Sequence, residues 1–142
     1  MTGVRQRPVV EGVLETALYV DDLASASAFY EDVIGLRPIF GDSRLAAFDA
    51  GRHGVLLLFL RGSTLETVHM PGGSIPPHDG RGPLHLAFAI ATDALPAWEA
   101  HLAAKDVPIE SRTRWPRGQS LYFRDPAGHL VELATPGLWP TR

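Results

Sequence analysis

An internal repeat is the feature that most constrains how this chain can fold. Sliding the sequence by 70 positions lays LETALYVDDLASASAFYEDVIGLRPI over LHLAFAIATDALPAWEAHLAAKDVPI, so that Pro38-Ile39 falls on Pro108-Ile109. A shift of 74 positions lays residues 54–58 over residues 128–132. Few of the superposed residues are identical, but the predicted elements follow one another in the same order. The repeat therefore predicts two copies of one structural unit.

Each copy has the sequence pattern of a strand, a helix and three further strands. In the first copy the β-forming residues end at Asp21-Asp22, and helical spacing follows. Asp22 suits the N-cap of this helix, and Gly35 suits the left-handed position that ends it. The first copy is predicted to have strands at residues 13–20, 37–40, 45–49 and 55–60. The second is predicted to have strands at 84–90, 107–110, 120–124 and 129–134, and a helix at 93–105.

The two copies are expected to form a single domain over residues 1–142, because a chain of 142 residues suits one domain. The segment from 61 to 82 is rich in Gly, Pro, Ser and His, and cannot form a long regular element. The predicted organisation is a first module at about 10–62, a linking or pocket-covering loop at 63–82, and a second module at about 83–136.

Composition argues against several classes of protein. Thirteen Lys and Arg against sixteen Asp and Glu give a net charge of -3 without long basic runs, so nucleic acid is not an expected partner. The longest apolar runs are strand-length, too short to span a bilayer, so no membrane partner is expected. The opening MTGVRQRPVV lacks the apolar stretch of a secretory signal, and zero cysteines exclude disulfides and thiolate metal sites. The predicted location is the cytoplasm.

Polar residues stand at equivalent positions in the first strands of the two copies. His85 lies within the apolar run LHLAFAI, and its counterpart in LETALYV is Glu15. Because side chains alternate along a strand, Glu15 shares a face with Ala17 and Tyr19, and His85 with Ala87 and Ala89. The opposite faces carry the aliphatic residues and Phe88, which are expected to point toward the helices. Glu132, in the last strand, shares a face with Leu130 and Ala134. An unpaired buried charge is costly, so the three residues are predicted to be partners on one cavity face.

Glu15, His85 and Glu132 have the chemistry of a metal site. Two carboxylates and one neutral imidazole carry a charge of about -2, which matches a divalent cation, and three protein ligands leave positions open for water or substrate. Without a metal the carboxylates would repel one another. Two other roles stay open for Glu15: an exposed residue of an edge strand, or a general base. A lone histidine in a strand is itself more often a satisfied core or surface residue than a ligand.

Three stretches of the chain resemble the vicinal oxygen chelate superfamily. They are LETALYVDDLASASAFYEDVIGL, GPLHLAFAI and LYFRDPAGHLVELATPG, and together they extend over nearly the whole chain. The superfamily contains glyoxalases, bleomycin-resistance proteins, fosfomycin-resistance enzymes, methylmalonyl-CoA epimerases and extradiol dioxygenases. The resemblance implies an α+β fold, in which two βαβββ modules form an open, barrel-like cavity, and it implies a homodimer.

The resemblance also implies metal ligands at Glu15, His85 and Glu132. The first of these is usually histidine in the family, so Glu15 is a departure. A fourth ligand would fall near Leu58 by the internal repeat, and leucine cannot bind a metal. Extradiol dioxygenases use two histidines and a carboxylate, whereas only one histidine stands at these positions here. The implied cofactor is a divalent metal ion, namely Mn, Fe, Ni, Zn or Mg.

Side chains near the implied site are candidate substrate contacts. Tyr122 and Arg124 share a strand face. Trp115 lies just before them in the loop RTRWPRGQS, between Arg114 and Arg117. This cationic and aromatic cluster could orient an anionic substrate by charge-assisted hydrogen bonds, although solvated arginines are the commoner case. The remaining histidines are expected on the surface, although His78 could close over the pocket. They are His53, His69, His78, His101 and His129.

Three functions are compatible with the sequence. The first is a divalent-metal-dependent enzyme that chelates the oxygen atoms of a small-molecule substrate and performs lyase, isomerase or dioxygenase chemistry. The alternative is a non-catalytic protein of the bleomycin-resistance type that binds a small molecule or antibiotic at a dimer interface. A structural or regulatory relative with neither metal nor ligand ranks last, because it would leave Glu15 and Glu132 repelling each other.

Overall fold

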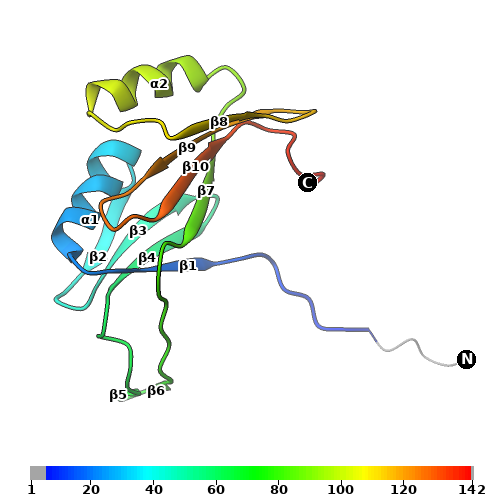
Figure 1. Cartoon of the computed structure of the whole chain (residues 1–142). Coiled ribbons are helices and arrows are strands. Elements are labelled where there is room, and N and C mark those ends of the chain that lie inside the picture. The colour runs from blue at the N-terminus through cyan, green and yellow to red at the C-terminus, as the bar shows by residue number, and fades with distance from the viewer. Residues whose placement is uncertain (1–5, 142) are drawn as a thin grey trace, which may run out of the picture.

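The computed structural model describes residues 6–141 and contains two four-stranded sheets (Figure 1). The strand orders are β1-β4-β3-β2 and β7-β10-β9-β8. In each sheet the first strand of the module pairs in parallel with the last, and the other pairs are antiparallel. The predicted α+β fold of two βαβββ modules is therefore confirmed, and the sheets curve without closing into a barrel.

The first module runs from Glu15 to Leu60. Its strands are β1 (Glu15–Val20), β2 (Arg37–Gly41), β3 (Leu45–Gly51) and β4 (Gly54–Leu60). Helix α1 (Leu23–Phe29) continues into the π-helical turn η1 (Tyr30–Ile34). The Asp22 side chain accepts a hydrogen bond from the backbone N–H of Ser25 at 3.0 Å, and Gly35 ends the helix at a φ of 85°. Both predicted helix boundaries are confirmed.

The second module runs from His85 to Ala134. It consists of β7 (His85–Ala89), α2 (Leu95–Ala104), β8 (Ser111–Arg114), β9 (Gln119–Arg124) and β10 (Leu130–Ala134). The strand predicted at 107–110 is wrong, and β8 begins at Ser111 instead. Pro108 has no N–H to donate to a sheet, and its neighbours Val107 and Ile109 pack against the core.

The segment between the modules carries a short hairpin that the sequence did not predict. Its strands are β5 (Val68–Met70) and β6 (Gly73–Ile75), and it projects away from the two sheets (Figure 1). Within residues 6–141, no helix has the length and apolar character that crossing a membrane would require.

The core joins the two modules. Phe29 of α1 lies 6.2 Å from Phe123 of β9 between ring centroids, and the buried Tyr30 hydroxyl donates to Asp125 Oδ2 at 2.6 Å. The face of the second sheet that carries Phe123, Val131 and Leu133 is therefore covered. The opposite face of that sheet remains available for a site.

The prediction that His129 lies on the surface is wrong, because its side chain is fully buried. As expected, His129 lies on the opposite side of the sheet from Glu132, but that side faces the core. Nδ1 accepts a hydrogen bond from the backbone N–H of Leu84 at 2.8 Å, so the proton is on Nε2, which donates to the Tyr19 carbonyl at 2.7 Å. His129 thus ties β10 to both β1 and β7.

Candidate metal centre

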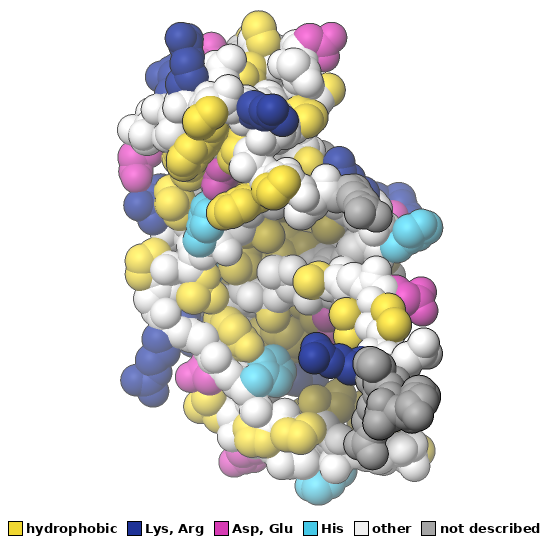
Figure 2. Space-filling view, turned by 90° about the vertical axis from the view of Figure 1, so that its right-hand side faces the viewer, with side chains coloured by type: hydrophobic (Ala, Val, Ile, Leu, Met, Phe, Trp, Pro, Cys, Tyr) yellow, Lys and Arg dark blue, Asp and Glu magenta, His cyan; other side chains and the backbone are white. Residues whose placement is uncertain are grey.

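The register of the second sheet gathers polar side chains on its uncovered face. Leu130 stands opposite His85, Tyr122 opposite Glu132, and Ser120 opposite Ala134. Because side chains alternate along each strand, His85, Glu132 and Tyr122 point to the same side of the sheet. Figure 2 views the molecule from the side to which the chain termini extend, and apolar side chains lie in a recess across the middle of this face.

His85 and Glu132 come into direct contact on this face. His85 Nε2 lies 3.2 Å from Glu132 Oε1, and the side chains are 51% and 9% exposed. His85 Nδ1 lies 3.0 Å from the Leu130 carbonyl oxygen, which can only accept, so Nδ1 carries a proton and donates. In the neutral ring Nε2 then presents its lone pair toward a carboxylate oxygen. The Nε2 lone pair and the carboxylate oxygen both donate electron pairs, so a cation or a proton is needed between them.

This arrangement fits a divalent metal ion. A metal-binding histidine usually donates its other ring N–H to a carbonyl or carboxylate, and this bond fixes both the ring and its tautomer. His85 already has that bond with Leu130. Nitrogen and carboxylate oxygen are ligands that Zn, Fe, Ni and Mn accept.

Ser120 and Trp115 hold the second oxygen of the carboxylate. The Ser120 hydroxyl donates to Glu132 Oε2 at 2.5 Å, and Trp115 Nε1 donates to the Ser120 oxygen at 2.9 Å. Ser120 is 1% exposed, so water does not compete for this bond. One oxygen of Glu132 is thereby fixed inside the fold, and the other faces His85.

Glu15 does not join His85 and Glu132 within one chain. It is exposed at the start of β1. In the part of the chain that the structure describes, no three His, Asp or Glu side chains come close enough to hold a metal together. A single protomer therefore brings together two of the three predicted ligands.

The pairing also corrects the position equivalent to Glu132 in the first module. In the first module Glu15 of the first strand pairs with Val55 of the last strand, and in the second module His85 pairs with Leu130. Equivalent residues of the two modules are therefore 70 positions apart in the first strands and 75 positions apart in the last strands. Glu132 then corresponds to Leu57, whereas Leu58 points into the core. Since neither leucine can bind a metal, the first module offers no fourth ligand at this position.

The three predicted substrate contacts differ in whether their polar groups already have partners within the protein. Tyr122 lies beside the metal centre, with its ring centroid 6.4 Å from that of His85. Arg124 is already paired with both oxygens of Glu110 at 3.0 Å, and this pairing holds the pKa of Glu110 below its usual range. Trp115 uses its N–H on Ser120 and leaves part of the indole exposed.

A cavity of about 620 Å³ lies beside Glu132. Ala87, Ala89 and Ala134 give it a wall of small side chains. Its other walls come from the β3–β4 turn and from the segment that follows β10, and they include Arg52, Leu138 and Trp139. Glu132 is the candidate ligand that lines the cavity, so a small molecule held there would lie next to its carboxylate.

The uncovered face of the first module carries a histidine whose role the sequence did not reveal. His78 Nδ1 lies 2.6 Å from the Tyr19 hydroxyl, and the His78 ring packs edge-on against Phe59 at 4.8 Å. Burial and the nearby Asp79 carboxylate both raise the pKa of Tyr19. His78 is thus half-buried rather than solvated, and no spacing in IPPHDGRG indicates this contact.

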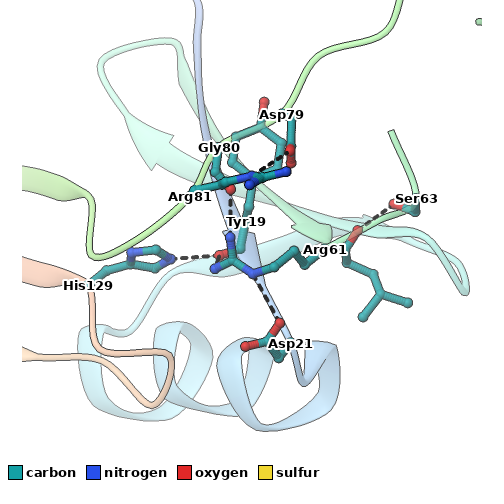
Figure 3. Close-up of polar contacts among 9 residues, drawn as sticks. Tyr19, Asp21, Arg61, Ser63, Asp79, Gly80, Arg81 and His129 are labelled. Carbon is teal, nitrogen blue, oxygen red and sulfur yellow. Dashed lines mark hydrogen bonds and ion pairs between the residues drawn. The ribbon is translucent and has the colours of Figure 1, made fainter. Parts of the chain in front are cut away.

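Arg61 fixes the loop that carries His78 (Figure 3). Its guanidinium donates to Asp21 Oδ1 at 3.0 Å, to the Gly80 carbonyl at 2.6 Å and to the Tyr19 carbonyl at 3.0 Å. The Tyr19 carbonyl is also the acceptor for His129 Nε2. One backbone oxygen therefore connects the first module, the loop and the second module.

Comparison with known proteins decides the family. Residues 12–133 match the model of the Glyoxalase/Bleomycin resistance protein/Dioxygenase superfamily. The chain belongs to this superfamily. Within it, the chain is 29% identical over 126 residues to the metallothiol transferase FosB of Bacillus licheniformis, covering 87% of this chain and 75% of the relative. The corresponding protein of Shouchella clausii is 27% identical over 130 residues, with 89% and 82% covered.

Solved structures of superfamily members have the same fold. A lactoylglutathione lyase from Agrobacterium tumefaciens superposes with a TM-score of 0.84 and 36% identity, covering 93% of this chain and 98% of that one. The fosfomycin resistance protein FosX from Listeria monocytogenes superposes with a TM-score of 0.66 and 21% identity, covering 92% and 97%. At that identity, FosX supports the fold alone.

Proposed function

We propose that this protein is a divalent-metal-dependent enzyme that acts on a small oxygen-bearing substrate through metal chelation. The observation that carries the proposal is the convergence of His85 Nε2 and Glu132 Oε1 at 3.2 Å, with the histidine proton placed on Nδ1 by Leu130. The names of two relatives support it, since one is a metallothiol transferase and the other a lactoylglutathione lyase. Lyase or isomerase chemistry is favoured over dioxygenase chemistry, because extradiol dioxygenases use two histidine ligands and only His85 stands at a ligand position here.

His85 and Glu132 would hold the metal ion, and the cavity beside them would hold the substrate. The metal that they would hold would supply Lewis acidity toward substrate oxygen atoms. Ser120 keeps Glu132 in its ligating position. Tyr122, whose ring centroid lies 6.4 Å from that of His85, would donate a hydrogen bond to the substrate.

A second copy of the chain would supply Glu15, either as the third ligand or as the base that accepts a proton from the substrate. Residues 6–14 extend away from the body of the molecule (Figure 1), and Val9, Val10 and Val13 on this arm are 86%, 88% and 83% exposed. Clusters of exposed apolar side chains mark association surfaces. We therefore expect a homodimer in which the first module of one protomer faces the second module of its partner.

Sequestration of a small molecule without chemistry is the second candidate. One observation favours it: a single chain provides two candidate ligands beside a cavity partly walled by Leu138 and Trp139. Such a protein would bind its ligand equally well without metal.

Metal binding tests the proposal. Untagged protein would be loaded with Mn, Fe, Ni or Zn, desalted and analysed by mass spectrometry for metal per chain. We expect near-stoichiometric metal in the wild type, loss in His85→Ala and Glu132→Ala, and retention in His69→Ala, a matched control because His69 is exposed on β5. A wild type that retains no metal would reject the enzyme proposal and favour sequestration.

A further inference from the structure

Arg52 occupies a backbone conformation that arginine rarely adopts. It stands with His53 in the two-residue turn between β3 and β4, where Gly51 pairs with Gly54. The φ angles of Arg52 and His53 are 51° and 62°. Hairpin turns with two left-handed central residues strongly favour Asn and Gly, because a Cβ atom there crowds the backbone. Backbone strain of this kind is often found at functional sites, and Arg52 has no evident packing role that would explain it.

Arg52 lines the cavity that also contains Glu132. It also lines an adjoining groove between β1 and β7, which shares Ala87, Phe88 and Ala89 with the cavity. The β3–β4 turn of the first module therefore brings a positive charge to the substrate cavity of the second module.

The exposed Arg52 guanidinium has no protein partner among the residues that the structure describes. Across residues 6–141 it takes part in no hydrogen bond and no ion pair, whereas Arg61 makes three hydrogen bonds and Arg124 is paired with Glu110. Asp49, three residues away, is engaged by Arg37 instead. An arginine on a cavity wall with all its donors free is suited to bind an oxyanion from solution.

We infer that Arg52 is a specificity-determining residue and that the cavity selects an anionic substrate. The oxygen atoms of one end of the substrate would chelate the metal at His85 and Glu132, and a separate carboxylate group would bind Arg52. Leu138 and Trp139 would contact the apolar part between these ends. The chelating end of this inference rests on the proposed function, while the anionic end rests on the turn geometry and the cavity alone.

Matched metal chelators test the inference. Metal-loaded protein would be titrated calorimetrically with hydroxamates that carry a second carboxylate at different distances, namely those of succinic acid, glutaric acid and terephthalic acid, and with the carboxamide analogue of each. We expect at least one carboxylate to bind about tenfold more tightly than its carboxamide, which is the effect of one partly solvated charged contact. The preference should shrink with added salt, because the interaction is between charges.

Two glycine variants separate the side chain from the backbone strain. Arg52→Gly and His53→Gly each relieve one left-handed residue, so both are expected to keep or raise the melting temperature. Only Arg52→Gly should abolish the carboxylate preference, and His53→Gly should retain it. Equal binding of carboxylate and carboxamide by the wild type, or a preference that survives in Arg52→Gly, would overturn the inference.

The same titrations distinguish a failure of the inference from a failure of the proposed function. Binding of the carboxamide hydroxamates to metal-loaded protein without any carboxylate preference would leave the metal centre standing and reject the role of Arg52. If the protein takes up no metal, the proposed function fails. Benzoate and benzamide, titrated into metal-free wild type and Arg52→Gly, would then still decide whether Arg52 binds an anion.

Discussion

Replacing Ser120 with alanine should weaken metal binding without removing a ligand. The Ser120 hydroxyl is the donor to Glu132 Oε2, at 2.5 Å, and both side chains are buried. A hydrogen bond to a charged group contributes about 1.5–3 kcal/mol. If that free energy is lost from the metal-bound state, the dissociation constant rises by roughly 10- to 100-fold, which is also the usual effect of removing an outer-shell partner of a metal ligand.

Competition between the protein and a fluorescent chelator would measure this change. Ser111→Ala is the matched control, because Ser111 is an exposed hydroxyl on the same face, opposite Tyr122, and strand β9 separates its strand β8 from β10, which carries Glu132. Trp115→Phe should have a smaller effect of about threefold, since it removes only the donor to Ser120. Wild-type metal affinity in Ser120→Ala would refute the argument that this hydroxyl positions Glu132.

Three further predictions concern stability and assembly. Burial and the Asp125 carboxylate raise the pKa of Tyr30 above its unfolded value near 10. The free energy of unfolding should therefore fall as the pH rises above about 10, by up to about 1.4 kcal/mol per pH unit. In urea titrations at several pH values, Tyr30→Phe should make this fall smaller. His129→Ala leaves the Leu84 N–H and the Tyr19 carbonyl without this partner and should cost about 2–4 kcal/mol in urea unfolding, whereas His69→Ala should cost little. Val10→Ser with Val13→Ser should raise the dimer dissociation constant in sedimentation equilibrium, and an unchanged constant would exclude the arm from the interface.

Much of the fold could be predicted because the sequence carries local signals that the structure retains. The repeat indicated two βαβββ units, and Asp22 and Gly35 marked the ends of the first helix. Strand alternation placed His85 and Glu132 on one face, and the register brings them into contact. Strand alternation and helix capping are local properties, and the repeat showed that the same local pattern occurs twice.

The features that could not be predicted from the sequence depend on contacts between distant segments of the chain. The offset of 75 in the last strands was misjudged by one residue, because the connections between strands differ in length between the modules, as at residues 42–44 and 115–118. His129 was expected on the surface because nothing local reveals the Leu84 N–H and the Tyr19 carbonyl that it meets. Arg52 was overlooked for the same reason, since its importance comes from a cavity formed by both modules.

X-ray absorption spectroscopy of the zinc-loaded protein would show whether His85 and Glu132 hold a divalent metal. We expect scattering from a single imidazole with oxygen ligands at about 2.0–2.2 Å, and loss of the imidazole signal in His85→Ala. Zinc that shows two or more imidazoles, or the same spectrum in His85→Ala as in the wild type, would place the metal at other residues.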